Sequence, residues 1–361
     1  MPDSARGSTG AAPLHGHSGR DARGATIREV AGRAGVSIKT VSRVVNNEPN
    51  VRPQTRERVL AAVAELDYEP HPAARGLAGR RTFSIGLLYE NPHEFSYIQR
   101  LLEGAHAACQ ATGHVLLLRP CTEGVTPLMV RQFARQTRVD GLLLTAPIAD
   151  REDITTTLVE SGIGFAQISP RAPNSAWPSV CPDDEQAGRA LTDHVLSLGH
   201  RRVGFVKGDP RHGASDKRLA GHLGSLNDHG IDADPALVVD GRFDFESGKR
   251  GFEALWHLHD PPTAVIASND DTAAGVVVAA HERGVDVPGT LAVAGFDDSP
   301  TATHTWPALT TVRQPIAAIA FRATELLIAG LSGEPARQET FECDLVTRAS
   351  MAAPKRLEET G

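Results

Sequence analysis

The sequence has few cysteines and no long apolar run. Its four cysteines lie far apart and include no Cys-x-x-Cys pair, which argues against a zinc site or a redox motif. No stretch approaches the roughly 18 apolar residues of a membrane helix, and residues 1–24 lack the apolar core of a secretory signal. Gly-x-Ser-x-Gly, Walker A, His-Glu-x-x-His and complete dinucleotide-binding motifs are also missing. We therefore predict a cytoplasmic protein with no enzymatic activity, cofactor or metal.

The net charge of −7 is distributed unevenly along the 361 residues. Residues 1–81 contain 13 Lys and Arg against 8 Asp and Glu, a balance of +5, whereas residues 82–361 carry −12. A basic N-terminal part on an acidic body indicates that only the N-terminal part binds a polyanion. The length suits a small domain followed by a larger two-lobed body.

A pair of short helices is predicted near the N-terminus. Thr26 and Glu29 have the spacing of a capping box, so a helix should begin there. Gly35 permits the positive φ of a tight turn, and Ser37 can cap a second helix whose inward face is formed by valines. Two short helices joined by a glycine turn form a helix-turn-helix, whose second helix can enter the major groove of DNA.

The outward side chains of the second helix suit this task. Lys39 and Arg43 can donate to guanine, and Ile38 can contact a thymine methyl group. Serine and threonine hydroxyls can reach phosphates. The alternative is a solvated surface on a small helical bundle. The residues predicted to contact double-stranded DNA are Thr26, Ser37, Ile38, Lys39, Thr40, Ser42, Arg43, Asn46, Arg75 and Leu77.

A third helix is predicted from Pro53 to about Leu66, with Leu60 on its apolar face. The segment TIREVAGRAGVSIKTVSRVVNN, followed by VRPQTR, resembles the N-terminus of the LacI/GalR family of transcription regulators. Residues 68–78 match the hinge pattern Y-x-P-x-x-x-A-R-x-L-A of that family. The resemblance implies that Leu77 enters the minor groove and bends the duplex. The alternative is a plain interdomain linker.

From residue 82 onwards, short apolar runs alternate with helical stretches, which predicts parallel sheets covered by helices on both faces. The motifs LGHRRVGFVKG, ASND, VAGFDDSP and LTTVRQP resemble the same family and periplasmic sugar-binding proteins. The fold class is therefore an all-α helix-turn-helix head followed by a two-lobed α/β periplasmic-binding-protein-like domain with Rossmann-like lobes. The predicted parts are a disordered tail (1–24), the helix-turn-helix domain (25–70), a hinge (71–81), a first lobe (82–182 and 313–335), a second lobe (183–312 and 336–352) and a tail (353–361).

In open parallel sheets, ligands bind beyond the carboxyl ends of the strands. The resemblance implies that Arg218 holds a ligand hydroxyl or carboxylate, that Asn269 makes amide contacts and that Asp297 accepts from hydroxyls. Such groups beside a flat apolar wall suit a polyhydroxylated ring, so a sugar is the leading effector. The residues predicted to bind the effector are Tyr89, Thr145, Ser169, His212, Ser215, Arg218, Phe243, Asn269 and Asp297.

Several alternatives stay open at this point. Ser169 stands where relatives that bind simple sugars often carry Asp, and purines, which some relatives sense as corepressors, are the second ligand class. For each cleft residue the alternative role is helix capping or loop stabilisation, and Asp270 and Asp298 suit either role equally. No Leu heptad follows Arg348, so we expect a homodimer without a C-terminal coiled coil. The alternative function is a sugar-binding receptor that does not bind DNA.

Overall fold

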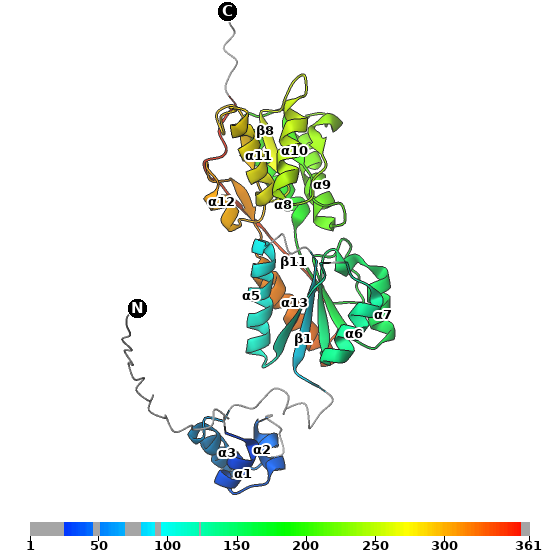
Figure 1. Cartoon of the computed structure of the whole chain (residues 1–361), viewed down its shortest axis with the longest axis vertical. Coiled ribbons are helices and arrows are strands. Elements are labelled where there is room, and N and C mark those ends of the chain that lie inside the picture. The colour runs from blue at the N-terminus through cyan, green and yellow to red at the C-terminus, as the bar shows by residue number, and fades with distance from the viewer. Residues whose placement is uncertain (1–24, 46–50, 69–80, 91–94, 123, 355–361) are drawn as a thin grey trace, which may run out of the picture. The chain divides into compact units, whose positions relative to one another are not determined.

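A computed structural model describes residues 25–45, 51–68, 81–90, 95–122 and 124–354 (Figure 1). The chain divides into two compact units, Met1–Gly79 and Arg80–Gly361, and each is described by itself. The predicted N-terminal tail, most of the hinge and most of the C-terminal tail lie outside the described residues.

The described residues of the smaller unit form three helices, α1 (Ile27–Ala34), α2 (Ile38–Val45) and α3 (Pro53–Glu65). The predicted capping box is confirmed, because the Thr26 hydroxyl accepts from the Glu29 backbone N–H and the Glu29 carboxylate accepts from the Thr26 backbone N–H. Gly35 has the predicted left-handed conformation, with φ of 63°. The turn that separates α1 from α2 therefore forms where the sequence places it.

The core of the smaller unit joins all three helices. Val30 of α1, Val41 of α2 and Val59 of α3 are fully buried and pack in one apolar cluster with Tyr68. The apolar face predicted for the third helix is wrong at Leu60, whose exposed fraction is 49%. Ala62 is buried instead, because it lies three residues after the fully buried Val59 and so on the same face of the helix, whereas Leu60 does not.

The first lobe of the larger unit is a six-stranded parallel sheet with helices on both faces. The strand order is β11-β5-β4-β3-β1-β2. Helices α5 and α13 pack on one face, and α6 and α7 cover the other (Figure 1). The bounds are β1 Ser84–Tyr89, α5 Phe95–Ala111, β2 Val115–Pro120, α6 Pro127–Thr137, β3 Gly141–Thr145, α7 Glu152–Glu160, β4 Gly164–Ile168, β5 Ser179–Pro182, α13 Ile316–Leu331 and β11 Gln338–Phe341.

The second lobe repeats this design with four parallel strands in the order β7-β6-β8-β9. Phe205 of β6 packs with α8 and α9, whereas its neighbour Val206 packs with α10 and α11, as the alternation of a strand requires. The bounds are α8 Asp184–Ser197, β6 Val203–Val206, α9 Gly213–Asp228, β7 Val238–Val239, α10 Phe245–Trp256, β8 Ala264–Ala267, α11 Asp270–Glu282, β9 Ala292–Ala294 and α12 Pro300–His304.

Three connections join the two lobes. The first follows β5, the second follows β10 (Thr311–Arg313), and the third lies between β11 and β12 (Asp344–Val346). β10 and β12 form an antiparallel pair, and isolated bridges connect the residues around β10 to the end of β9. The prediction that 336–352 belongs to the second lobe is therefore wrong for its first part, because β11 pairs with β5 in the sheet of the first lobe.

No described helix has the length and apolar character needed to cross a membrane.

Candidate functional site

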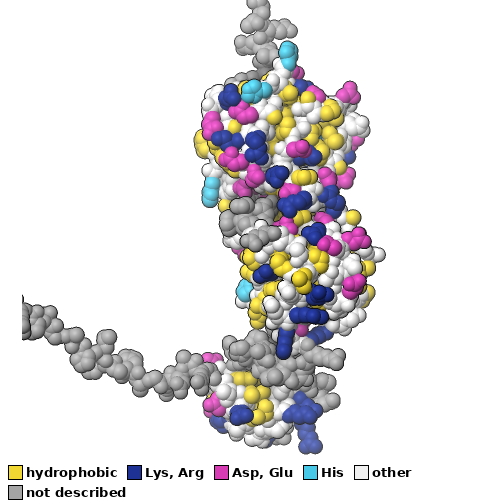
Figure 2. Space-filling view, turned by 45° about the vertical axis from the view of Figure 1, so that its right-hand side comes forward, with side chains coloured by type: hydrophobic (Ala, Val, Ile, Leu, Met, Phe, Trp, Pro, Cys, Tyr) yellow, Lys and Arg dark blue, Asp and Glu magenta, His cyan; other side chains and the backbone are white. Residues whose placement is uncertain are grey.

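The outward face of α2 presents the polar and basic side chains that suit DNA. Ser37 and Lys39 are exposed, and the exposed fraction of Ile38 is 44%. Lys and Arg side chains project from one side of this unit (Figure 2). Half-buried positions on the same helix are Thr40, Ser42 and Arg43. The helix thus offers one apolar and several polar groups toward solvent.

Two hydroxyl-bearing residues fix the starts of the first two helices. The Ser37 hydroxyl accepts from the Thr40 backbone N–H at 3.2 Å and shares a hydrogen bond with the Thr40 hydroxyl at 2.9 Å. Thr26 caps α1. Of the other predicted DNA contacts, Asn46, Arg75 and Leu77 lie outside the described residues.

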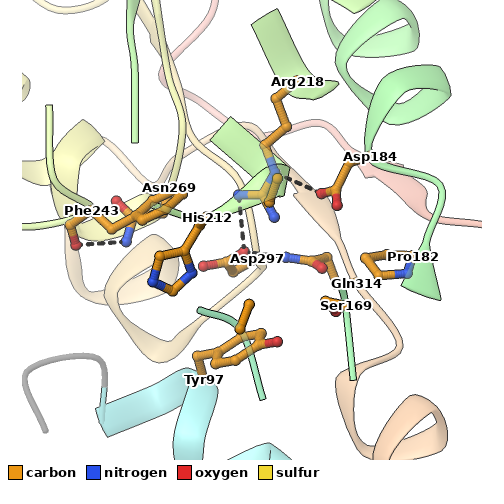
Figure 3. A pocket seen from close by; sticks show the side chains of 12 residues that line it. Tyr97, Ser169, Pro182, Asp184, His212, Arg218, Phe243, Asn269, Asp297 and Gln314 are labelled. Atoms are coloured by element: carbon orange, nitrogen blue, oxygen red, sulfur yellow. Dashed lines mark hydrogen bonds and ion pairs between the residues drawn. The ribbon is translucent and has the colours of Figure 1, made fainter. Parts of the chain in front are cut away.

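A pocket lies between the two lobes of the larger unit, at the carboxyl ends of the strands (Figure 3). Its free volume is about 40 Å³, which is room for a few water molecules. A larger molecule therefore needs more room than the pocket offers in this arrangement. The lining residues are Tyr97, Ala146, Ser169, Pro182, Asp184, His212, Ala214, Arg218, Phe243, Asn269, Asp297 and Gln314.

Arg218 of α9 is the central charged group of this pocket. Its Nε donates to the Asp184 carboxylate at 2.8 Å, and its Nη1 donates to the Ser268 carbonyl at 2.5 Å. Its Nη1 also lies 3.8 Å from Asp297. The guanidinium carbon lies over the Phe296 ring, 3.7 Å from its centre, so the aromatic face stabilises the cation through a cation–π interaction. These contacts fix the guanidinium in a place from which it can meet a ligand.

The carboxylate of Asp297 is the acceptor that faces Arg218. Burial raises the pKa of Asp297, and this rise is opposed by the Arg218 guanidinium and by the amide of Gln314, which donates to Asp297 at 2.5 Å. Asn269 has a different position. Its Oδ1 accepts from the backbone N–H of Thr272 as the cap of α11, and its Nδ2 donates to the carbonyl of Phe243. Asn269 therefore has the capping role that was the alternative to ligand binding.

An aromatic wall closes one side of the pocket. The rings of His212 and Phe243 meet edge to face, with their centres 5.5 Å apart. Burial lowers the pKa of His212 to about 4, so its imidazole is neutral at pH 7. Tyr97, from α5 of the first lobe, enters the pocket from the side opposite Arg218 (Figure 3). The wall can pack against the flat face of a ring while the charged groups hold its polar edge.

Three lining residues have left-handed backbone conformations. The φ angles are 53° at Ser169, 62° at Phe243 and 110° at Asp297. Such conformations are uncommon for residues other than glycine, and they concentrate at ligand-binding sites. Here each of them turns the chain sharply just after a strand or before a helix.

Contacts across the cleft hold the lobes together. Arg171 of the first lobe pairs with Asp216 of the second and donates to the Pro210 carbonyl at 2.7 Å. In the reverse direction, Arg211 of the second lobe donates to Glu90 at 2.8 Å. These polar contacts are partly exposed and can break when the lobes separate.

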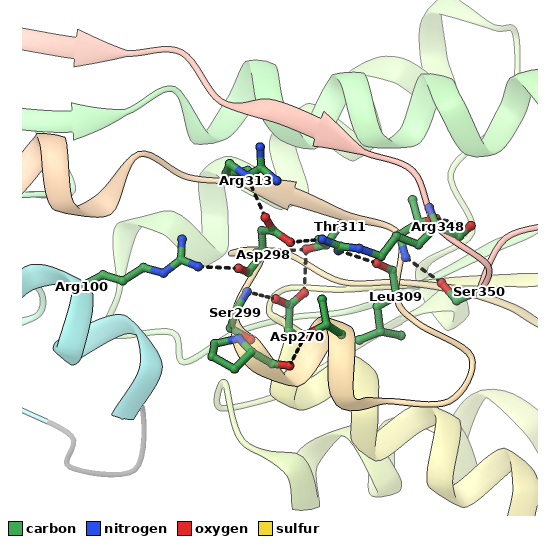
Figure 4. A network of polar contacts seen from close by, with 12 residues as sticks. Arg100, Asp270, Asp298, Ser299, Leu309, Thr311, Arg313, Arg348 and Ser350 are labelled. Atoms are coloured by element: carbon green, nitrogen blue, oxygen red, sulfur yellow. Dashed lines mark hydrogen bonds and ion pairs between the residues drawn. The ribbon is translucent and has the colours of Figure 1, made fainter.

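A polar network beside the pocket contains Asp270 and Asp298 (Figure 4). Asp298 accepts from Arg313 at 2.7 Å and from Arg348 at 2.5 Å. Asp270 accepts from the Ser299 backbone N–H at 2.7 Å and from the Thr311 hydroxyl at 2.6 Å. Neither aspartate lines the pocket, so both have structural roles at the crossing between lobes.

Six of the nine residues predicted to bind an effector line the pocket, and three do not. Tyr89 is half-buried against the core of the first lobe. Thr145 is buried and donates to the Leu88 carbonyl, and the buried Ser215 accepts from the Gly208 backbone N–H. The predicted cleft position of Ser215 is therefore wrong, because its hydroxyl closes the loop before α9.

Sequence reasoning missed three polar lining residues. Asp184 is the first residue of α8 and lies two positions after β5, a strand of four residues that the alternation of apolar runs did not reveal. Gln314 belongs to the quoted motif LTTVRQP, and its position beside a strand end could have indicated it. Tyr97 lies on a helix, where the strand-end rule gives no signal.

Comparisons with known proteins agree with this architecture. The family model described as "Bacterial regulatory proteins, lacI family" matches residues 26–71, and the one described as "Periplasmic binding protein-like domain" matches residues 192–351. The HTH-type transcriptional regulator AscG of Escherichia coli (strain K12) is 32% identical over 334 residues, which cover 92% of this chain and 99% of AscG. GalS of Salmonella typhimurium is 34% identical, with 91% of this chain and 96% of GalS covered.

Solved structures show the same fold. The lac repressor dimer bound to operator and the anti-inducer ONPF has a TM-score of 0.74 at 26% identity, covering 92% of this chain and 100% of that chain. The transcriptional regulator CelR-cellobiose complex has a TM-score of 0.69 at 29% identity, covering 90% of this chain and 99% of that chain. Because relatives more than 30% identical match almost the whole length, the chain belongs to the lacI family of DNA-binding bacterial transcriptional regulators.

Proposed function

We propose that this regulator binds a near-palindromic operator as a homodimer and represses transcription, under the control of a sugar that occupies the pocket between the lobes. The observation that carries the proposal is the combination, in one chain, of an outward polar face on α2 and a buried Arg218 held between two carboxylates. A related lac repressor is described as a dimer bound to operator, which supports the dimeric arrangement.

The DNA contacts follow from the side chains of α2. Lys39 and Arg43 would donate to guanine edges, Ile38 would meet a thymine methyl group, and the hydroxyl groups would reach phosphates. In a dimer the two copies of α2 would lie about one DNA turn apart, which is why the operator should be near-palindromic. Leu77 lies outside the described residues, and its insertion into the minor groove remains a proposal.

The ligand class follows from the chemistry of the pocket. Arg218 offers donors, Asp297 offers an acceptor, and Phe243 and the neutral ring of His212 provide an apolar wall. A sugar presents hydroxyls at its rim and C–H groups on its faces, so it meets both kinds of surface. The relative CelR is described in complex with cellobiose, which supports the same class.

Ligand binding would act through the cleft. In the closed arrangement the contacts of Arg171 and Arg211 bridge the lobes. A ligand that favours one degree of closure shifts the balance between DNA-competent and incompetent dimers, with a typical coupling of about 1–3 kcal/mol.

The DNA part of the proposal is tested by fluorescence anisotropy with the DNA upstream of the regulator's own gene. We expect salt-sensitive, specific binding, and Arg43→Ala should relax the preference for one base by about 1–3 kcal/mol. Arg58→Ala removes the same charge from α3 and should leave the base preference unchanged. Equal effects of both changes on every sequence would contradict the roles given to α2.

The ligand part is tested by thermal denaturation with a panel of sugars and nucleobases. A ligand at about 100 times its dissociation constant adds roughly 2.7 kcal/mol of stability. The shift should disappear in Asp297→Asn and persist in Asp240→Asn, a change at an exposed carboxylate. A nucleobase that stabilises the protein while no sugar does would replace the sugar by the second ligand class.

A further inference from the structure

A second cavity lies in the second lobe, at the amino ends of its strands. Its volume is about 150 Å³. The pocket in Figure 3 lies beyond the carboxyl ends of the same strands, so the sheet separates the two. The apolar part of its lining consists of Val203, Leu223, Leu226, Ile231, Ala233, Leu237 and Val238.

One buried polar side chain lines this cavity. His222 of α9 is 1% exposed, and its ring packs against Phe205 with 5.0 Å between the ring centres. Its Nδ1 lies 3.1 Å from the Thr192 hydroxyl. That hydroxyl donates its proton to the Gly188 carbonyl, so it can only accept from His222. The proton of the neutral ring therefore belongs to Nδ1.

This tautomer leaves Nε2 as an acceptor. Within the part of the chain that the structure describes, no hydrogen bond reaches Nε2 of His222, and the ring is part of the cavity lining. Burial lowers the pKa of His222 to about 4, so the ring stays neutral at pH 7. Nε2 is not one of the fully buried polar atoms that lack a partner, so water reaches it through the cavity. A donor on a ligand would take the place of that water.

The charged groups at the rim do not favour an ionic occupant. Nη1 of Arg201 donates to the carbonyls of Leu196 and His200 at 3.0 and 2.9 Å. Arg202 pairs with Asp234 at 3.0 Å and with Asp260 at 3.2 Å. Both guanidinium groups already have partners, and Asp232 is exposed at the rim. The interior of the cavity is therefore mainly apolar, with His222 as its buried polar side chain.

We propose that this cavity is a second small-molecule site, which binds a neutral, ring-sized and mainly apolar molecule with one O–H or N–H group donated to Nε2 of His222. An apolar cavity of about 150 Å³ in another protein holds benzene, so a phenol has a suitable size. The site is independent of the pocket proposed for the sugar, since none of its lining residues is shared with that pocket.

The test measures binding of phenol and of fluorobenzene, which has no donor, to the full chain by ligand-observed NMR and calorimetry. Phenol should bind saturably and about tenfold more tightly than fluorobenzene, as the net gain from one hydrogen bond implies. Replacing His222 by Leu should make the two affinities equal. Ile231→Trp fills the cavity from a half-buried loop position while leaving the His222 residue itself in place, and should weaken both ligands at least tenfold.

Val159→Trp is the matched control, because it adds the same ring beside an apolar hollow of the first lobe. It should leave phenol binding unchanged. Thermal melting confirms that each variant is folded, and Ile231→Trp keeps the test decisive if His222→Leu does not fold. The proposal is overturned if phenol does not bind saturably, if Val159→Trp rather than Ile231→Trp abolishes binding, or if fluorobenzene binds the wild-type chain as tightly as phenol.

Discussion

Replacing Arg218 by methionine removes the guanidinium that lies between the carboxylates of Asp184 and Asp297. The side chains of Arg218 and Asp184 are 6% and 2% exposed, so this ion pair is buried. Removing one partner of a buried pair leaves an uncompensated charge and costs about 3–5 kcal/mol. We expect Arg218→Met to lower the melting temperature of the larger unit by about 10 °C.

The assay is thermal and urea denaturation of the wild type, Arg218→Met, Asp184→Asn and the double variant. The double variant should be more stable than the sum of the single effects, because removing the carboxylate relieves the charge that Arg218→Met exposes. Arg283→Met breaks a partly exposed pair with Glu253 and should cost less than about 1 kcal/mol.

A pH series gives an independent check on the same variant. Burial already raises the pKa of Asp297, and the Arg218 guanidinium opposes that rise. Without the guanidinium the folded protein holds this proton at higher pH than the unfolded chain does, so the stability of Arg218→Met should fall as pH rises. The deficit relative to wild type should thus be smaller at pH 5 than at pH 8. A loss under 1 kcal/mol, additive effects or a deficit that grows toward low pH would refute the reasoning.

Four further substitutions test local features. Gly221→Ala places a methyl group 2.0 Å from the Glu185 carbonyl and should cost about 1–3 kcal/mol, whereas Gly330→Ala meets only a proline carbon at 3.9 Å and should be neutral or slightly stabilising in urea denaturation. Thr26→Ala removes the cap of α1 and should cost the smaller unit about 1 kcal/mol, measured by circular dichroism. Burial lowers the pKa of His222 from 6.5 to about 4, so the contribution of His222 to the free energy of unfolding should be complete above pH 6.5 and be lost as the pH falls toward 4. The variant His222→Gln should flatten this part of the curve of stability against pH. An unchanged slope would contradict the prediction.

The sequence predicted the regular parts of the fold well, because each long element has a local signal. The capping box at Thr26 and the glycine turn at Gly35 are set by neighbouring residues, and the structure contains both. Short strands and helices contain too few residues to reveal the period of their apolar side chains. β11 was assigned to the wrong lobe because its pairing with β5 joins residues far apart in the chain, which no local pattern reveals.

The pocket was predicted less completely, for a different physical reason. Strand ends indicate which loops approach the cleft, and this located Ser169 and Asp297 beside it, whereas Arg218 was predicted from the resemblance. They do not tell which way a side chain points. Thr145 and Ser215 follow the rule but turn inward to satisfy backbone groups, whereas Tyr97 reaches the pocket from a helix. That the lining residues contact an effector stays a prediction.

The left-handed residues of the pocket limit how its ligand preference can be redesigned. At Ser169, Phe243 and Asp297 the main chain itself excludes β-branched replacements, which would add about 1–3 kcal/mol of strain before any ligand is met. Directed evolution should instead vary Tyr97 and Ala214, which reach the cavity from helices, where the backbone conformation is open to most residue types. A library confined to such positions would sample new specificities without first discarding folded protein.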